Sequence, residues 1–138
     1  MIVDTSALLA ILFNESDAET YARAIAQADA PRISAANFVE AAIVIEAQTK
    51  NSSSSSQLDA FMRRAGIAIE PVTEEQAHAA RQAYTDFGKG RHSAALNFGD
   101  CFAYALAKVT GNPLLFKGKD FSQTDITPAI STHPKRSK

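Results

Sequence analysis

The sequence has little cysteine, no excess of charge of either sign and no long hydrophobic run. These absences argue against a disulfide-stabilised secreted domain and against a membrane protein. The single Cys101 cannot form an internal disulfide, which fits a reducing cytoplasm better than a secreted, disulfide-stabilised domain. The longest apolar stretches are too short to span a bilayer. Residues Met1–Asp4 carry neither a basic segment nor a cleavage-site pattern. We therefore expect a soluble, cytoplasmic protein that makes no membrane contact.

Charge is balanced, because 14 Lys and Arg stand against 15 Asp and Glu for a formal net charge of −1. Nonspecific nucleic-acid binding through a large positive field is therefore not indicated. A nucleic-acid substrate is still compatible with this balance, since a cluster of acids would lower the total and a bound divalent ion would reverse the local potential. With 138 residues and 46% hydrophobic content, residues 1–138 are expected to form one domain with a real core.

Short apolar runs alternate with helical patterns along the chain. Strands are expected at residues 2–3, 31–33, 67–69 and 114–116, with a weak edge strand at Ile126. Helices are expected at residues 7–12, 16–28, 38–47, 58–65, 73–87 and 98–110. This alternation predicts an α/β protein, a three-layer α/β/α sandwich around a mostly parallel sheet of about four or five short strands.

Polar residues mark the ends of these helices. Side-chain caps are expected from Thr5 or Ser6, from Ser34 and from Asn97, and capping boxes at Ser16–Glu19 and Thr73–Gln76. The helix over 38–47 is apolar on nearly every side, so we expect it to lie deep in the structure. The serine-rich stretch 51–56 is expected to be an exposed connection within the domain, and the chain from about residue 131 a flexible tail.

Four acidic residues stand beside apolar segments, where a solvated carboxylate is not the obvious explanation. They are Asp4, Glu40, Asp100 and Asp120. Carboxylates near a core cost free energy unless they are paired, hydrogen-bonded or bound to metal. The ligand crevice of an open parallel sheet lies beyond the carboxyl ends of its strands, where Asp4 and Asp120 fall. If the four converge, their oxygens favour Mg²⁺ or Mn²⁺.

Each acid also has a simpler explanation. Asp4 could belong to a capping cluster, although Thr5 and Ser6 could cap without it, which favours a metal ligand with Ser6 in support. Glu40 could form a buried ion pair with Arg32 or Arg23.

The other two acids lie in segments where carboxylates are common. Asp100 lies in the first turn of its helix, where the helix dipole favours a carboxylate whatever the function. Asp120 follows a basic turn in which loop acids are usually solvated, and Asp125 competes with it as the fourth acid.

The four acids lie in four motifs, which are Met1–Leu8, Ile33–Ala41, Leu96–Ala107 and Pro113–Phe121. Together these motifs resemble the PIN-domain ribonucleases and, within them, the toxins of VapBC toxin–antitoxin pairs. The resemblance covers nearly the whole chain, and Gly99–Ala107 and Val3–Ser6 are its most specific parts. The chain departs from the family pattern at Lys119, where many members carry Asp or Asn, and in its serine run.

This resemblance implies a Mg²⁺- or Mn²⁺-dependent endoribonuclease that inhibits translation or growth until its VapB-type antitoxin binds. Asp4 and Asp100 would be the first ligands of the metal, with Glu40 and Asp120 acting directly or through water. A homodimer, RNA cut in a single-stranded loop and products with 5′-phosphate and 3′-hydroxyl ends are also implied. Basic side chains near the acids are candidates to hold the RNA backbone: Lys89, Arg91, His92, Lys117 and Lys119.

Two other functions stay open from the sequence. The first is a noncatalytic PIN-like module that binds a partner without cutting RNA. The second is an aspartyl-phosphate phosphotransfer domain, which also places an Asp after a first strand. Such sites need further acids close to the phosphorylated Asp, and Thr5–Ala7 after Asp4 supplies none.

Overall fold

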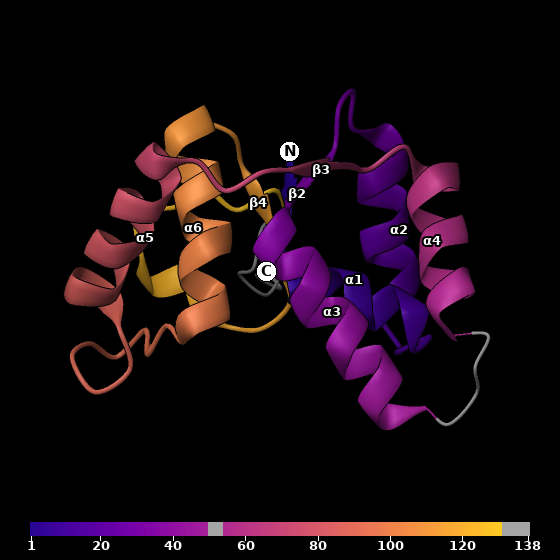
Figure 1. The fold of residues 1–138 in the computed structure, drawn as a ribbon, viewed down its shortest axis with the longest axis horizontal. Helices are drawn as coiled ribbons and strands as arrows, with labels where there is room; N and C mark the ends of the chain where they lie inside the picture. The colour runs from indigo at the N-terminus through magenta and orange to yellow at the C-terminus, as the bar shows by residue number, and fades with distance from the viewer. Residues whose placement is uncertain (50–53, 131–138) are drawn as a thin grey trace, which may run out of the picture.

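The computed structural model describes residues 1–49 and 54–130 (Figure 1). Its four strands form one parallel sheet in the order β3-β2-β1-β4. The strands are β1 (Ile2–Val3), β2 (Arg32–Ser34), β3 (Ala68–Glu70) and β4 (Leu114–Leu115). The helices of the described residues are α1 (Thr5–Leu12), α2 (Ala18–Gln27), α3 (Ala35–Gln48), α4 (Ser54–Ala65), α5 (Glu74–Phe87), α6 (Phe98–Thr110) and the 3₁₀ helix η1 (Phe121–Gln123).

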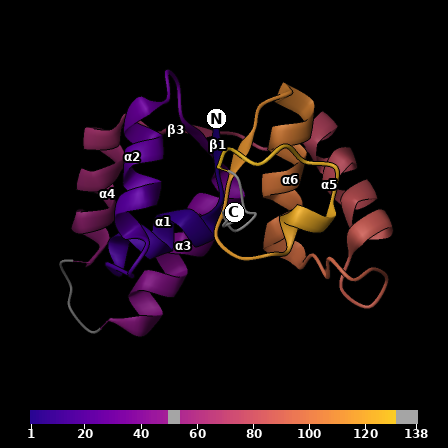
Figure 2. The same ribbon diagram turned by 180° about the vertical axis from the view of Figure 1, so that it is seen from behind.

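Helices cover both faces of this sheet, which confirms the predicted three-layer α/β architecture. Successive residues of a strand point to opposite faces. Ile2 and Leu114 accordingly pack into the core under α5 and α6, whereas Val3 and Leu115 pack into a second core with α1 to α4. Figures 1 and 2 show these two groups of helices on opposite sides of the strands. None of the helices in the described ranges is long and apolar enough to cross a membrane.

The free edge of β4 carries a single bridge in place of the expected edge strand at Ile126. The Leu114 amide donates to the Thr127 carbonyl at 2.9 Å, and the Ala129 amide donates to the Leu114 carbonyl at 2.8 Å. These bonds pair Leu114 with Pro128 in an isolated parallel bridge. Ile126 is buried under α5 and α6 instead, because its side chain gains more from that core than from an exposed edge.

Helix α3 is less buried than its composition predicts. Ala41 and Ile45 lie in the core, but Val39 is 52% exposed and Ile43 is 60% exposed. The expectation that this helix lies deep is therefore wrong for one of its faces. The reason is geometric, since the sheet has only a few short strands and covers one side of the helix alone.

Two details at helix starts also differ from the sequence prediction. Ser54–Ser56 form the first turn of α4, with Ser54 buried, so the second half of the predicted serine connection is helical. Residues 51–53 and the predicted tail from 131 lie outside the described residues. The predicted capping box at Ser16 does not form. Asp17 is the N-cap of α2 without a capping hydrogen bond, because its carboxylate accepts from Lys117.

Candidate functional site

Asp4 ends β1 and begins α1, at the carboxyl edge of the sheet. It is 3% exposed, and its Oδ2 accepts hydrogen bonds from the Ser6 amide at 3.0 Å and the Ser6 hydroxyl at 2.5 Å. Asp4 is thus itself the N-cap of α1, and the prediction that Thr5 or Ser6 caps this helix is wrong. Burial raises the pKa of Asp4 to about 6, assisted by the charge of Glu40 and opposed by the Ser6 hydrogen bonds. The carboxylate is therefore costly to ionise in spite of its cap.

Glu40 lies in the second turn of α3 and does not pair with an arginine. Its Oε1 accepts from the Thr5 hydroxyl at 2.6 Å and from the side-chain Nδ2 of Asn37 at 3.3 Å. The two arginines considered as its partners bind other acids, Arg32 with Glu70 and Arg23 with Glu19. The ion-pair explanation for Glu40 is therefore wrong in this structure.

Asp100 lies in the first turn of α6 and forms a capping box with Asn97, which confirms Asn97 as the cap. The Asp100 amide donates to Asn97 Oδ1 at 2.9 Å, and the Asn97 amide donates to Asp100 Oδ2 at 3.0 Å. Burial raises the pKa of Asp100 to about 7, and the charges of Asp4, Asp120 and Glu40 add to the rise. The hydrogen bond from the Asn97 backbone opposes it.

The structure separates the two candidates for the fourth acid. Asp120 is exposed at the start of η1 and is close enough to Asp100 to raise its pKa. Asp125 accepts from the Tyr104 hydroxyl at 2.6 Å and from Lys108 Nζ at 2.5 Å. These contacts lower the pKa of Asp125. Asp120 therefore lies with the other acids. Asp125 instead binds Tyr104 and Lys108 and so joins the C-terminal segment to α6.

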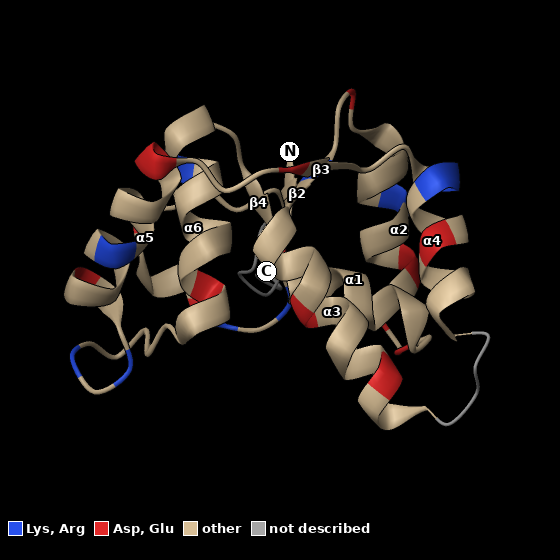
Figure 3. Ribbon diagram, in the orientation of Figure 1, with Lys and Arg blue, Asp and Glu red and all other residues tan. Residues whose placement is uncertain are grey.

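Charges from distant parts of the sequence thus raise the pKa of two carboxylates. Glu40 acts on Asp4, and the charges of Asp4, Asp120 and Glu40 act on Asp100. Figure 3 shows acidic positions on α3 and α6 on either side of the loop between β4 and η1. Each raised pKa means that the folded protein holds these charges at a cost that a bound cation would remove. A set of carboxylate oxygens is the donor chemistry that Mg²⁺ and Mn²⁺ prefer.

The acids fit an ion that keeps part of its water shell. Within residues 1–49 and 54–130, no three acidic, histidine or cysteine side chains lie close enough together to hold a metal ion as a group. Mg²⁺ commonly binds through one or two carboxylates and retains several waters, which substrate phosphates can replace. The residues present therefore suit such an ion better than one that needs a full protein cage.

The basic candidates for RNA contact have different surroundings. Lys117 Nζ binds Glu15 at 2.5 Å and Asp17 at 3.1 Å, so its charge is already paired. His92 Nδ1 accepts from the Ala94 amide at 2.9 Å, and its ring packs edge-on against Phe87.

The remaining three basic side chains are more available. The Arg91 guanidinium lies 5.6 Å from the centre of the Tyr84 ring. Lys89 and Lys119 are exposed and make no ion pair with another described residue. These three remain the candidates for RNA contact.

Two residues that the sequence reasoning did not select hold the acids in place. Asn37 is fully buried and donates to the Gly99 carbonyl at 2.9 Å as well as to Glu40. Gly99 allows α6 to approach Glu40, because a Cβ at this position would lie 2.3 Å from Glu40 Oε2. The only local signal was a polar residue three positions before Glu40 in an apolar segment.

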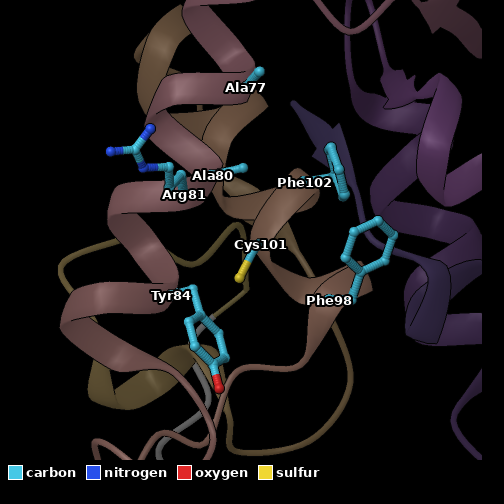
Figure 4. Close-up of a pocket in the computed structure, with 7 residues that line it drawn as sticks. All are labelled: Ala77, Ala80, Arg81, Tyr84, Phe98, Cys101 and Phe102. Atoms are coloured by element: carbon cyan, nitrogen blue, oxygen red, sulfur yellow. The ribbon is translucent and has the colours of Figure 1, made fainter.

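An apolar surface adjoins the acids on α3, α5 and α6. One groove of about 370 Å³ lies between α5 and α6, and a second of about 280 Å³ lies between α3 and α6. Phe98 and Phe102 line both grooves, and Phe98 is 78% exposed. Figure 4 shows these two rings together on α6, with Tyr84 and Cys101 between α5 and α6. Contiguous exposed apolar side chains of this kind mark binding surfaces.

A family model and individual proteins similar to this chain agree with one another. The PIN domain family matches residues 1–126. The chain is 51% identical over 131 residues to Ribonuclease VapC28 of Mycobacterium tuberculosis, covering 94% of this chain and 98% of the relative. It is also 51% identical over 126 residues to Ribonuclease VapC of Mycolicibacterium smegmatis, covering 91% and 97%.

A solved structure has the same fold. The crystal structure of Mycobacterium tuberculosis VapC20, described as a sarcin-ricin loop cleaving toxin, matches with a TM-score of 0.74. The match covers 91% of this chain and 95% of VapC20 at 17% sequence identity. At that identity the likeness supports the fold alone.

Proposed function

This chain belongs to the PIN domain family and, within it, to the VapC ribonucleases, and from that membership we propose that it is a toxin endoribonuclease that hydrolyses RNA with a divalent metal ion. The observation that carries this proposal is the meeting of three acids from distant segments. Thr5, the residue after Asp4, donates to Glu40 at 2.6 Å, and the Glu40 carboxylate lies against Gly99, the residue before Asp100. The free toxin would inhibit translation or growth in the cytoplasm until its antitoxin binds.

Asp4 and Asp100 are the proposed direct ligands of Mg²⁺ or Mn²⁺, with Glu40 and Asp120 binding directly or through water. The ion would activate a water molecule and stabilise negative charge on the phosphoryl and leaving oxygens. Two hydrogen bonds from Ser6 hold the Asp4 carboxylate, and the capping box holds that of Asp100. Backbone amides and the Ser6 hydroxyl thus orient the carboxylates of Asp4 and Asp100.

Access to the acids is uneven, and this suggests where the RNA backbone enters. Asp4 is buried and Asp120 is exposed, so a phosphate from solvent would approach from the side of η1. Lys119, beside Asp120, and Lys89 and Arg91, in the loop after α5, are the proposed contacts to neighbouring phosphates. Splayed phosphates of a single-stranded loop in a folded RNA would reach such a recessed site.

Cleavage of a total RNA pool tests this function. We expect cutting with Mg²⁺ or Mn²⁺, loss of cutting in EDTA, and near-complete loss in Asp4→Asn and Asp100→Asn. Asp125→Asn is the matched control, because this acid is bound to Tyr104 and Lys108 and should cut like the parent. If the two site variants cut as well as the parent, a contaminating nuclease is responsible and the site assignment fails.

The products separate the alternatives. Hydrolysis by a metal-activated water should leave 5′-phosphate and 3′-hydroxyl ends, and 2′,3′-cyclic phosphates would contradict it. A noncatalytic binding module would produce no new ends with either metal. Transfer of phosphate to Asp4 from a small phosphodonor would favour the phosphotransfer alternative.

The apolar surface on α3, α5 and α6 is the proposed docking surface for a VapB-type antitoxin. An amphipathic helix could place its apolar face on the grooves around Phe98. Phe98→Ser should then weaken copurification of the antitoxin, whereas Val72→Ser, at a residue that is 37% exposed and lines neither groove, should not. We further propose a homodimer, as the family implies, and light scattering of the purified chain measures it.

A further inference from the structure

Asn37 is a polar side chain in a place where an apolar one would be expected. It lies in the first turn of α3, is 0% exposed, and is surrounded by an otherwise apolar stretch of sequence. Burying a carboxamide costs free energy unless its donors and acceptor are satisfied. A leucine has the same branching and number of side-chain heavy atoms without a polar group to satisfy, so packing alone does not explain this residue.

Both donor contacts of the Asn37 side chain go to groups at the acidic site. Nδ2 donates to the Gly99 carbonyl at 2.9 Å and to Glu40 Oε1 at 3.3 Å. The first contact joins α3 to the N-terminus of α6, one residue before Asp100. The second restrains the Glu40 carboxylate on its own helix. One amide group therefore links the positions of two of the four acids.

Helix α1 is joined to the same arrangement through Thr5. Its hydroxyl lies 2.6 Å from Glu40 Oε1 and 3.2 Å from the Asn37 carbonyl oxygen. Thr5 follows Asp4 directly, so the three helices that carry Asp4, Glu40 and Asp100 meet around Asn37. A shift of this residue would change the separation of all three carboxylates.

The close approach of α6 to Glu40 explains why this arrangement needs a restraint. An ideal Cβ on Gly99 would lie 2.3 Å from Glu40 Oε2 and 2.6 Å from the carboxylate carbon. The Glu40 carboxylate thus lies directly against the Gly99 backbone, near the charge of Asp100. Without the Asn37 donors, repulsion between the acids would favour movement of Glu40 toward solvent.

One further observation indicates that the polar side chain is retained for more than stability. Asn37 Oδ1 is buried and accepts no hydrogen bond from any described residue. An unpaired buried acceptor destabilises the fold by about 1–3 kcal/mol. Reversing the amide would pair it no better, because an oxygen would then face the Gly99 carbonyl and the Glu40 carboxylate. The donors toward the site are therefore kept at a cost in stability.

We infer that Asn37 is a positioning residue, which holds Glu40 against the N-terminus of α6 so that Glu40, Asp4 and Asp100 act on the same metal ion and phosphate. This inference rests on the proposed ribonuclease function. Asn37 acts through the two groups to which its side chain donates, the Glu40 carboxylate and the Gly99 carbonyl. Interactions that orient metal ligands in this way change metal affinity or activity by about 10–100-fold when they are removed.

The main test compares Asn37→Leu with the parent in three measurements. We expect kcat to fall about 10–100-fold with little change in KM for the RNA, because ligand orientation is lost while RNA contacts remain. Binding of Mn²⁺ alone, followed by the electron paramagnetic resonance signal of the free ion, should weaken over a similar range. Urea unfolding should show a folded variant, since leucine keeps the branching of the side chain and a small shift can accommodate its larger methyl groups.

Gln76→Leu is the matched control. Gln76 is also buried and its Oε1 also lacks a partner among the described residues, but it lies on α5 and contacts none of the four acids. Its replacement should alter stability and leave kcat and Mn²⁺ binding unchanged. Equal losses of kcat in both variants would reduce Asn37 to an ordinary buried polar residue and overturn the inference.

A second variant decides the outcome if Asn37→Leu does not fold. Gly99→Ala keeps Asn37 and displaces the end of the flexible Glu40 side chain, so the fold should survive and kcat and Mn²⁺ binding should fall. Unchanged kcat and Mn²⁺ binding in a folded variant of either residue would overturn the inference. Failure of the proposed function is recognised separately, because the parent itself would then cut no RNA or would cut it in EDTA.

Discussion

Replacing Asp100 by Asn should stabilise the metal-free protein at alkaline pH while it removes activity. The parent carboxylate is partly buried near the charges of Asp4, Asp120 and Glu40, which raises its pKa to about 7. An asparagine has nearly the same shape and carries no charge. Its Oδ1 can still accept the hydrogen bond from the Asn97 amide, so the capping box that begins α6 is kept.

The size of the effect follows from the pKa of Asp100. Its folded value of about 7 lies roughly three units above the ordinary 3.8, and each unit corresponds to about 1.4 kcal/mol, so the ceiling is about 4 kcal/mol. Asp100 is only partly buried and solvent screens part of this energy, so we expect a gain of about 1–2 kcal/mol.

The sign of the pH dependence is fixed by the direction of the shift. Because the folded pKa lies above the unfolded one, the protonated carboxyl stabilises the parent fully below about pH 4, and this stabilisation is lost as the pH rises through 7. The advantage of Asp100→Asn should therefore grow between these values and stay constant above them.

Urea unfolding in EDTA at about pH 5 and about pH 8 measures this difference. Asp125→Asn is the control with the opposite sign, since Lys108 and Tyr104 lower the pKa of Asp125 and their contacts are lost in the variant. A lower stability of Asp100→Asn than of the parent at the higher pH would show that the acids do not crowd one another in the folded protein.

Three further outcomes are expected. Mn²⁺ affinity measured by calorimetry should fall as the pH drops from about 8 to about 5, because protons compete for Asp4 with its pKa of about 6 and Asp100 with its pKa of about 7; an affinity constant over this range would contradict the ligand assignment. Lys117→Met should lower the thermal midpoint most at low salt, because its ion pairs with Glu15 and Asp17 are exposed and screened by salt, and an equal loss at high salt would point to packing instead. Leu8→Ala should lower the free energy of unfolding by about 2–5 kcal/mol in urea, because Leu8 is 0% exposed; a loss well below that range would show that the core closes around the gap.

The architecture could be predicted from the sequence because the residues that set the element boundaries lie close together in the chain. The strand-to-helix switch at Asp4, the cap at Asn97 and the cap at Thr73 each depend on residues a few positions apart, and all three mark element boundaries in the structure. The boundary at Ser54 was missed because serines are compatible with both loops and helix starts. The Ser54 hydroxyl lies 2.5 Å from the Thr49 hydroxyl, and this contact links the helix start to the end of α3.

The contacts between distant segments could not be read in the same way. The basic turn that contains Lys117 looked like an RNA contact, but its partners Glu15 and Asp17 lie about a hundred positions earlier in the chain. The exposure of Val39 and Ile43 depends on how much of α3 the sheet covers. The residues around Gly99 do not predict its contact with the Glu40 carboxylate, because this contact forms only when α3 and α6 pack together.

The position of Asp4 and Asp100 at helix starts explains how the fold accommodates these two carboxylates although their ionised forms remain unfavourable. Asp4 caps α1 and Asp100 lies in the first turn of α6, where backbone amides and the helix dipole favour a carboxylate. Their pKa values are nevertheless raised, so burial and mutual repulsion exceed that local stabilisation. The residual unfavourable energy is available to favour a proton or a divalent ion. A divalent ion bound between the proposed ligands would remove this unfavourable energy. We therefore expect the neutral Asp100→Asn variant to be more stable without metal and inactive.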